Sequence, residues 1–161
     1  MIVTSMIMMF LLTYTNVFVA AHIRWSEERF YMALLMVAAM AIVMLVFMWG
    51  MYPSRTVNLS ILAAALVIAD AGLGLSRSQA FVNDRDYMRG MIPHHSIAIL
   101  TSERAGIEDL RVRELADGII TAQREEIAEM DWLLGDIKAN GLATTPEQAQ
   151  ARPVPEFSET P

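Results

Sequence analysis

The sequence predicts an all-α membrane protein in which three N-terminal transmembrane helices are followed by a small helical hairpin. The 161 residues are 55% hydrophobic with a mean hydropathy of +0.38, which is too apolar for an ordinary soluble domain of this size. Charge is also unevenly distributed, since residues 1–76 contain only three acidic and three basic side chains. We therefore expect a transmembrane domain over residues 1–76, a hairpin domain over 77–140 and a tail over 141–161.

Residues 1–21 are the first expected span. They contain no charged side chain, and a bilayer core of ~30 Å requires roughly 20 helical residues. A cleaved signal peptide is the alternative, because the small residues 19–21 could follow its apolar region. The usual basic start is missing and the apolar run is long, so we predict a retained helix.

Residues 30–52 and 57–75 are the second and third expected spans. Aromatic rings that favour the headgroup level flank the second, at Trp25, Tyr31, Trp49 and Tyr52. The third is charged only at Asp70, whose carboxylate either faces a partner or a watery cavity, or reaches the nearby interface. Methionine recurs every four residues from Met32 to Met48. A Cu(I) relay is one interpretation, but a four-residue repeat drifts ~40° per step, which favours gap-filling.

The predicted hairpin consists of a helix from Asn83 or Asp84 to about residue 105 and a second from 110 to 137. Asn140 and Gly141 are expected to close the second helix, and the tail after residue 144 is rich in proline and expected to be disordered. Two helices cannot enclose a core. We therefore expect either a homodimer that completes a four-helix bundle or docking onto a partner in a membrane complex.

A polar pair interrupts the apolar stripe of the second hairpin helix. At 100° per residue, Gln123 and Glu126 fall among the stripe residues Val112, Leu115, Ala116, Ile119, Met130, Leu133, Leu134 and Ile137. Polar groups at core positions need a hydrogen bond, an ion pair or a metal. A hydrogen bond across the hairpin and a metal site are both open interpretations.

The first hairpin helix places two adjacent histidines near thioethers. Met91 and His94 share a face with Ala98, and Asp84, His95 and Met88 lie at its shoulder. We expect this face to meet Glu126 and Met130. Imidazole with thioether suits copper, although adjacent histidines are also commonly satisfied by hydrogen bonds. Pro93 is expected to kink this helix or to mark its start.

Residues 91–95 read Met-Ile-Pro-His-His, and they are followed by Ala98-Ile99, Leu115-Ala116 and the Gln, Glu and Met of residues 123–130. This pattern resembles the domain-of-unknown-function family numbered 305. The resemblance covers about residues 81–134. It implies a ferritin-like helical fold and copper binding through Met91, His94, His95 and Met130, because some members are exported copper-binding proteins. After the histidines many relatives have Gln-Gly-Ala-Ile-Asp-Met, so residues 96–101 of this chain lack one carboxylate and one thioether.

The favoured function is that of a membrane-anchored metal-binding protein that takes a copper ion for sequestration, delivery or tolerance. Its candidate metal ligands are His94, His95, Met91, Met130, Glu126 and Met88, with Gln123, Asp84 and Asp70 as further candidates. The alternative is a non-catalytic structural or assembly subunit whose hairpin docks on a partner. An enzyme is least favoured, because no nucleophile with an aligned base and no Glu-x-x-His pair is visible.

The charge balance and the apolar half indicate the partners. All of the net charge of −6 lies after residue 76, which argues against nucleic acid and leaves the lipid bilayer as the expected partner. We expect a multi-pass protein of the cell inner membrane. The arginine distribution mildly favours a cytoplasmic hairpin, whereas the exported relatives favour a periplasmic one, which is our prediction.

Overall fold

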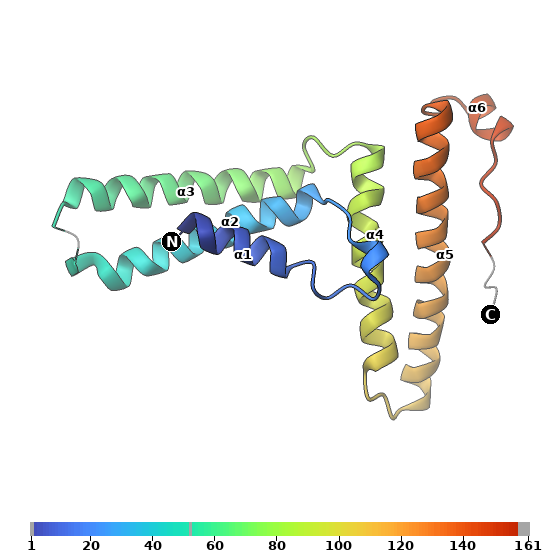
Figure 1. Cartoon of the computed structure of the whole chain (residues 1–161), viewed down its shortest axis with the longest axis horizontal. Helices are drawn as coiled ribbons and strands as arrows, with labels where there is room; N and C mark the ends of the chain where they lie inside the picture. Colours follow the sequence, from blue (N-terminus) through green and yellow to red (C-terminus); the bar gives the residue numbers. More distant parts are fainter. Residues whose placement is uncertain (1, 52, 158–161) are drawn as a thin grey trace. The chain divides into compact units, whose positions relative to one another are not determined.

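A computed structural model describes residues 2–51 and 53–157, which contain helices and no strand. Its elements are α1 (Ile2–Leu12), the 3-10 turn η1 (Ala20–His22), α2 (Glu27–Met48), η2 (Trp49–Met51), α3 (Arg55–Ser78), α4 (Asp84–Arg104), α5 (Leu110–Asn140) and α6 (Pro146–Ala151) (Figure 1). The chain forms two compact units. Residues 1–15 and 26–83 make the first, and residues 16–25 and 84–161 make the second.

The prediction of three membrane spans is wrong for the first span. Two helical segments of the described chain are long and apolar enough to cross a bilayer, Glu27–Met51 and Arg55–Ser78. Helix α1 ends at Leu12 and its 11 residues rise only about 16 Å, roughly half of a bilayer core. The side chains of Thr13 and Thr15 bind the carbonyl oxygens of Phe10 and Leu12, which end the helix locally.

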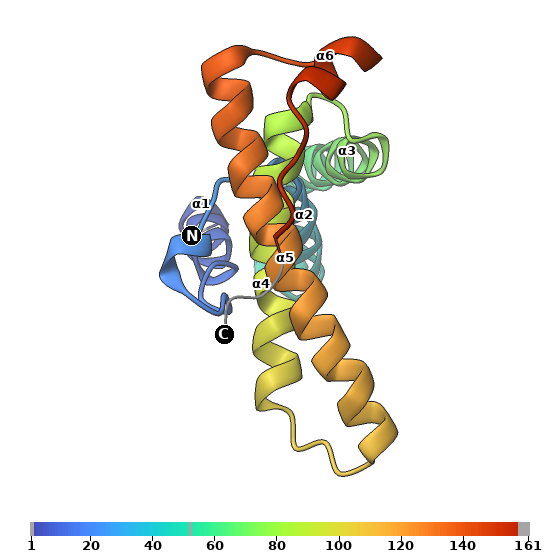
Figure 2. The same cartoon turned by 90° about the vertical axis from the view of Figure 1, so that its right-hand side faces the viewer.

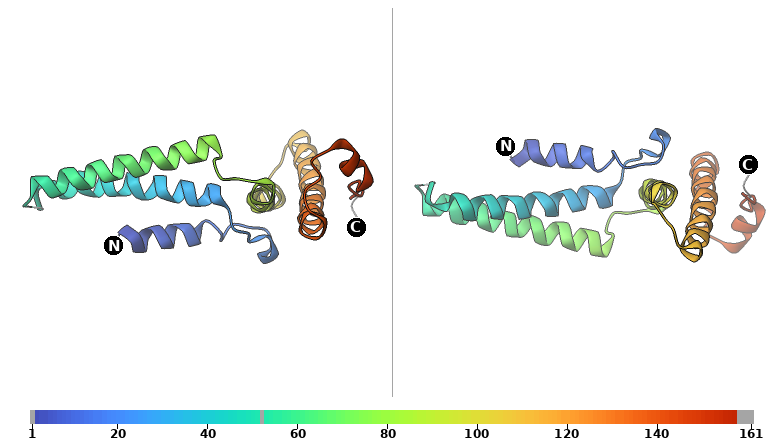
Figure 3. Two further views of the ribbon diagram at one scale, coloured as in Figure 1. Left: turned by 90° about the horizontal axis from the view of Figure 1, so that it is seen from above. Right: turned by 90° about the horizontal axis from the view of Figure 1, so that it is seen from below.

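In the first unit, α2 and α3 pack side by side and α1 lies along α2 (Figure 3). Gly72 permits the close approach of α3, because a Cβ there would lie 3.1 Å from the Tyr31 carbonyl oxygen and 3.3 Å from the Leu35 nitrogen. At the end of this pair, Ser76 and Gln79 donate to the two carboxylate oxygens of Glu28 at 2.7 and 2.8 Å. These polar contacts fix the level at which the apolar part of α3 ends.

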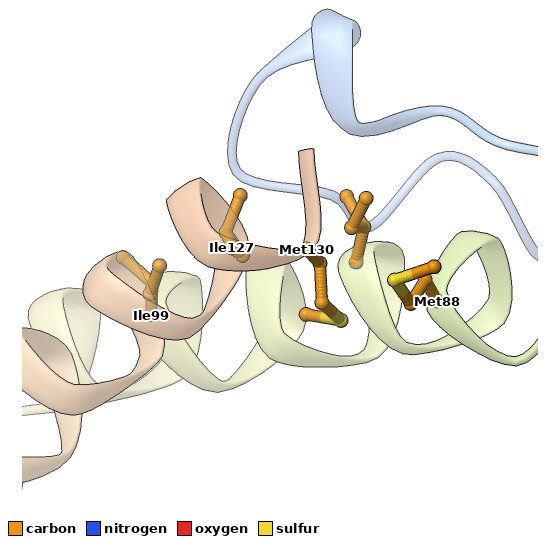
Figure 4. Packing of buried hydrophobic residues seen from close by; sticks show 5 residues of the cluster. Met88, Ile99, Ile127 and Met130 are labelled. Atoms are coloured by element: carbon orange, nitrogen blue, oxygen red, sulfur yellow. The ribbon is translucent and has the colours of Figure 1, made fainter. Parts of the chain in front are cut away.

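In the second unit, α4 and α5 form the expected antiparallel hairpin (Figure 2). The Asp109 carboxylate caps α5 by accepting from the Arg111 amide, and Gly141 ends the helix with a φ of 78°. The buried core of the hairpin consists of Met88, Ile92, Ile99, Ile127 and Met130 (Figure 4). An all-helical hairpin is therefore confirmed, whereas the ferritin-like bundle stays a prediction.

Helix α4 passes through Pro93 without starting there. Pro93 is buried ten residues into the helix. Its missing amide would have donated to residue 89, so only one helical hydrogen bond is lost.

The described part of the tail contains a short helix, and its expected disorder stays a prediction. Thr145 caps the short helix α6, and the Arg152 guanidinium binds the Asp136 carboxylate at 2.6 Å and the Gly141 carbonyl oxygen. These contacts hold the described part of the tail beside α5 (Figure 2).

Candidate metal centre

One side chain from each hairpin helix meets at the centre of the second unit. His95 of α4 is buried, and its Nε2 lies 2.6 Å from Oε2 of Glu126 on α5. On the other side of the ring, Nδ1 lies 2.9 Å from the carbonyl oxygen of Met91, one turn back along α4. Both ring nitrogens of His95 are therefore engaged, and the pair links the two helices.

The two contacts of His95 determine what can lie between it and Glu126. A carbonyl oxygen only accepts, so Nδ1 must donate its proton to Met91. In a neutral ring Nε2 would then carry a lone pair that faces a carboxylate oxygen, and two acceptors repel each other at 2.6 Å. A proton therefore lies between the two atoms and makes the contact a hydrogen bond, since 2.6 Å leaves no room for a metal ion at about 2 Å from each atom.

Glu126 is less enclosed than its place in the predicted stripe implied. Its side chain is 52% exposed, and Gln123 is half-buried. The two hydrogen bonds described for this carboxylate, from His95 and from the Gln123 amide at 3.2 Å, both reach Oε2. Oε1 is therefore open to a further donor or cation.

His94 does not meet the carboxylate of its own chain. The structure exposes His94, and its ring lies edge-on to that of His95 with centroids 6.1 Å apart. The prediction therefore chose a face of α4 that is one residue away from the face that meets α5. His95, placed at the shoulder of that face, is the histidine that faces the partner helix.

The candidate thioethers are packed in the hairpin core. Met88 and Met130 belong to the buried apolar cluster, in which they extend from the two facing helices, and Met91 packs against it (Figure 4). Methionine fills irregular gaps in such cores, so packing accounts for these positions without a metal. Along α4, Met91 lies one turn before His95 and Met88 nearly two turns before it.

The remaining candidates lie elsewhere. Asp84 begins α4, about 15 Å along the helix from the histidines. Asp70 is exposed on α3, and no hydrogen bond or ion pair is described for it. None of the five methionines from Met32 to Met48 is among the buried residues of α2. Within residues 2–51 and 53–157, no three His, Asp or Glu side chains gather closely enough to hold a metal by themselves.

Sequence reasoning missed a polar cluster that attaches the loop of residues 16–25 to α4. Ser96 is fully buried, accepts from the Phe18 amide at 2.7 Å and lies 2.9 Å from Nδ1 of His22. Arg24 also pairs with Asp131 of α5 at 3.0 Å. The polar run at residues 13–16 was the available signal, because it interrupts the apolar stretch that we took for one span.

Known proteins with related sequences establish the family. Residues 75–157 match the family described as Domain of unknown function (DUF305), which covers more than half of the chain. The chain belongs to the DUF305 family. Its DUF305 segment includes α4, α5 and α6, so the His95–Glu126 pair lies inside it. The expected membership is confirmed.

Sequence similarity to one relative extends beyond the DUF305 segment. The chain is 36% identical over 118 residues to a protein of Acanthamoeba polyphaga mimivirus described as Uncharacterized protein L153, which covers 72% of this chain and 76% of that protein. An alignment of this length must include residues before the DUF305 segment. No solved structure matches this DUF305 protein.

Proposed function

We propose that this chain is a membrane-anchored metal-binding protein that takes a copper ion at His95 and Glu126. The observation that carries the proposal is the contact between Nε2 of His95 and Oε2 of Glu126, which brings an imidazole and a carboxylate together from two helices. In the metal-free chain these atoms share a hydrogen bond. A metal ion bound to both, at about 2 Å from each, would displace the proton and move the two atoms slightly apart. Sequestration, delivery or tolerance of copper are the roles that such a site would serve.

The surroundings of His95 favour its use as a ligand. A metal-binding histidine usually donates its second ring nitrogen to a carbonyl or carboxylate, which fixes the tautomer and the ring orientation. The Met91 carbonyl does this here. Imidazole and carboxylate accept several divalent ions, and a thioether ligand from Met88, Met91 or Met130 of the same hairpin would shift the preference toward copper.

The apolar half supports the anchored part of the proposal. The α2 segment through Met51 and helix α3 are each long enough to cross a bilayer core. They would place the lipid bilayer around the first unit and hold the DUF305 unit at the membrane surface. We propose the periplasmic side of the inner membrane for the DUF305 unit.

The experiment is metal analysis of the full chain purified in detergent without added metal, followed by titration with Cu(I) and Cu(II). We expect copper binding that weakens about 10-fold or more in His95→Ala and in Glu126→Gln. His22→Ala is the matched control, because it also removes a histidine from the same unit and should leave the affinity unchanged. Equal, weak binding by the wild type and both site variants would overturn the proposal, provided that circular dichroism shows intact helices.

A structural or assembly subunit is the second candidate. It is favoured by apolar side chains that α5 leaves exposed, among which Leu115 is 64% exposed. In this case His95 and Glu126 would serve only to hold the hairpin together. Copurification of a stoichiometric membrane partner whose binding is insensitive to chelator, with no bound metal, would favour this function.

A further inference from the structure

One side of the hairpin in the second unit is uncovered. Helix α5 exposes 48% of Val112, 64% of Leu115 and 37% of Ile119 along this side, and Ala122 continues it. At 100° per residue these residues share a flank of α5 with Glu126. The loop of residues 16–25 covers the opposite side through Ser96 and Asp131. We call the uncovered flank, residues 112, 115, 119, 122 and 126 with His94 of α4, the open face.

The open face contains a hollow suited to a helix. Its lining residues all belong to α5: four of them are Leu115, Gly118, Ile119 and Ala122, and the others are Arg111, Glu114 and Gln123. The first four have the spacing i, i+3, i+4 and i+7, which is the spacing of a hole that receives a side chain from a neighbouring helix. Gly118 has nothing within 4 Å of its Cβ position, so the floor of the hollow is open.

Complementary polar groups lie on the same face. His94 is exposed, and Oε1 of Glu126 lacks a described hydrogen bond. Both groups stand at one level of the hairpin, because His95, the neighbour of His94, binds Glu126 directly. Within one chain, the hydrogen bonds described for Glu126 come from His95 and Gln123 and not from His94.

We propose that a second copy of this chain covers the open face, so that His94 of each copy meets Glu126 of the other. We place the two-fold axis parallel to the hairpin helices. Equivalent residues of the two copies then lie at the same height along this axis, and α4 of one copy packs on α5 of the other. The same two polar contacts then form twice, as an isologous interface requires. Small and apolar side chains, including Ala98, Leu115 and Ile119, surround these contacts, and the result is a four-helix bundle.

This pairing deepens the proposed function, because it supplies the copper site with a third protein ligand, the partner's His94. The pairing itself needs no metal, since an imidazole can donate directly to Oε1 of the carboxylate. Loss of pairing and loss of copper binding are therefore separable results.

The test uses the natural absence of cysteine from the chain. Two tagged full-length copies are coexpressed, one with Ala98→Cys and the other with Ala122→Cys, and purified through both tags in detergent with EDTA. The two positions lie on the open face at nearby levels of α4 and α5. We expect a mixed disulfide after mild oxidation. In the matched control Asp117→Cys replaces Ala122→Cys, because Asp117 is exposed on another side of α5, and no mixed disulfide should form.

A mass measurement completes the test. Light scattering of the detergent-purified protein should give a dimer for the wild type and a monomer for Leu115→Lys. Absence of the mixed disulfide, its equal formation with Asp117→Cys, or a monomeric wild type would each overturn the pairing. Copper bound by a monomer would leave the proposed function standing, whereas a dimer without copper binding would retain the pairing and remove the metal site.

Discussion

At the scale of single residues, His22 has the environment most sensitive to pH. Burial lowers the pKa of its imidazole below the ordinary value, Asp131 acts in the opposite direction and Arg24 lowers the pKa further. In the neutral tautomer that carries its proton on Nε2, Nδ1 of His22 accepts the hydroxyl proton of Ser96, and the Ser96 oxygen accepts from the Phe18 amide. Protonation of Nδ1 removes that acceptor and forces the buried hydroxyl to reorient.

We predict that attachment of the loop of residues 16–25 weakens in acid. A folded pKa below the unfolded one means that the unfolded chain binds more protons, so stability falls as pH drops below about 6.5. The thermal midpoint should fall more between pH 7.5 and pH 5.5 in the wild type than in His22→Asn. Thr101→Asn, a change at an exposed position of α4 that leaves His22 in place, should retain the wild-type drop. The same drop in His22→Asn would contradict this assignment.

The histidine pair also shows what residue patterns could predict. The spacing of residues predicted that a histidine of α4 would lie near Glu126. Which of His94 and His95 lies there depends on the rotation of α4 about its own axis. The small residues Ala98 and Ala105 suggested one face. The larger side chains Met88, Ile92 and Ile99 define the buried face instead, because they bury more apolar area, and His95 lies among them.

At the scale of helices, the approach of α3 to α2 depends on the missing side chain at Gly72. The atoms that a Cβ would meet include backbone atoms of Tyr31 and Leu35, which cannot rotate away. Gly74, two residues on, has nothing within 4 Å of its Cβ position. The two glycines therefore provide a matched comparison within one helix.

We predict that Gly72→Val destabilises the first unit by about 1–3 kcal/mol, because the helices must separate to admit the side chain. Gly74→Val should have little effect. Unfolding of the full chain in mixed micelles, followed by circular dichroism, measures both variants. Equal free energies of unfolding for Gly72→Val and Gly74→Val would show that α2 and α3 do not pack as closely as described.

The ends of helices were predicted unevenly. The end of α5 at Asn140 and Gly141 followed from local chemistry, because glycine readily adopts a positive φ. The end of α1 at Leu12 was missed, because residues 13–16 are uncharged and barely lower the mean hydropathy of a long window. Their hydroxyl groups and the contacts of residues 16–25 with α4 decide the outcome, and the latter are long-range.

At the scale of the whole molecule, two candidate membrane spans rather than three change the expected place of the residues before α2. Asn16 would lie inside the first expected span. In the structure it is exposed and belongs to the same unit as α4 and α5. If α2 and α3 cross the bilayer, Asn16 and the hairpin residue Lys138 lie in water on the same side, and Ser54 lies on the other.

We predict this pattern for single cysteines placed in the cysteine-free chain at Asn16, Ser54 and Lys138. A maleimide that does not cross membranes should label Asn16→Cys and Lys138→Cys from one side of sealed vesicles. Ser54→Cys should react only when the opposite side is accessible. An Asn16→Cys that reacts from neither side would restore the three-span arrangement.

The architecture was predictable to the level of an apolar half and a helical hairpin, because composition and periodicity determine both. The interruption near residue 13, the side of the hairpin that remains open and the partner of each histidine were not predictable. These features depend on contacts between distant segments, such as Ser96 with Phe18, which no local pattern encodes.

The most direct test of the account concerns the cation between His95 and Glu126. Calorimetric copper titrations of the full chain at pH 7, in buffers that differ in ionisation enthalpy, count the protons released on binding. If copper binds through His95 and Glu126, it displaces the proton of their hydrogen bond, so binding should release protons, and Glu126→Gln should change the number released. Copper binding without proton release, or with a release unchanged in Glu126→Gln, would contradict the account.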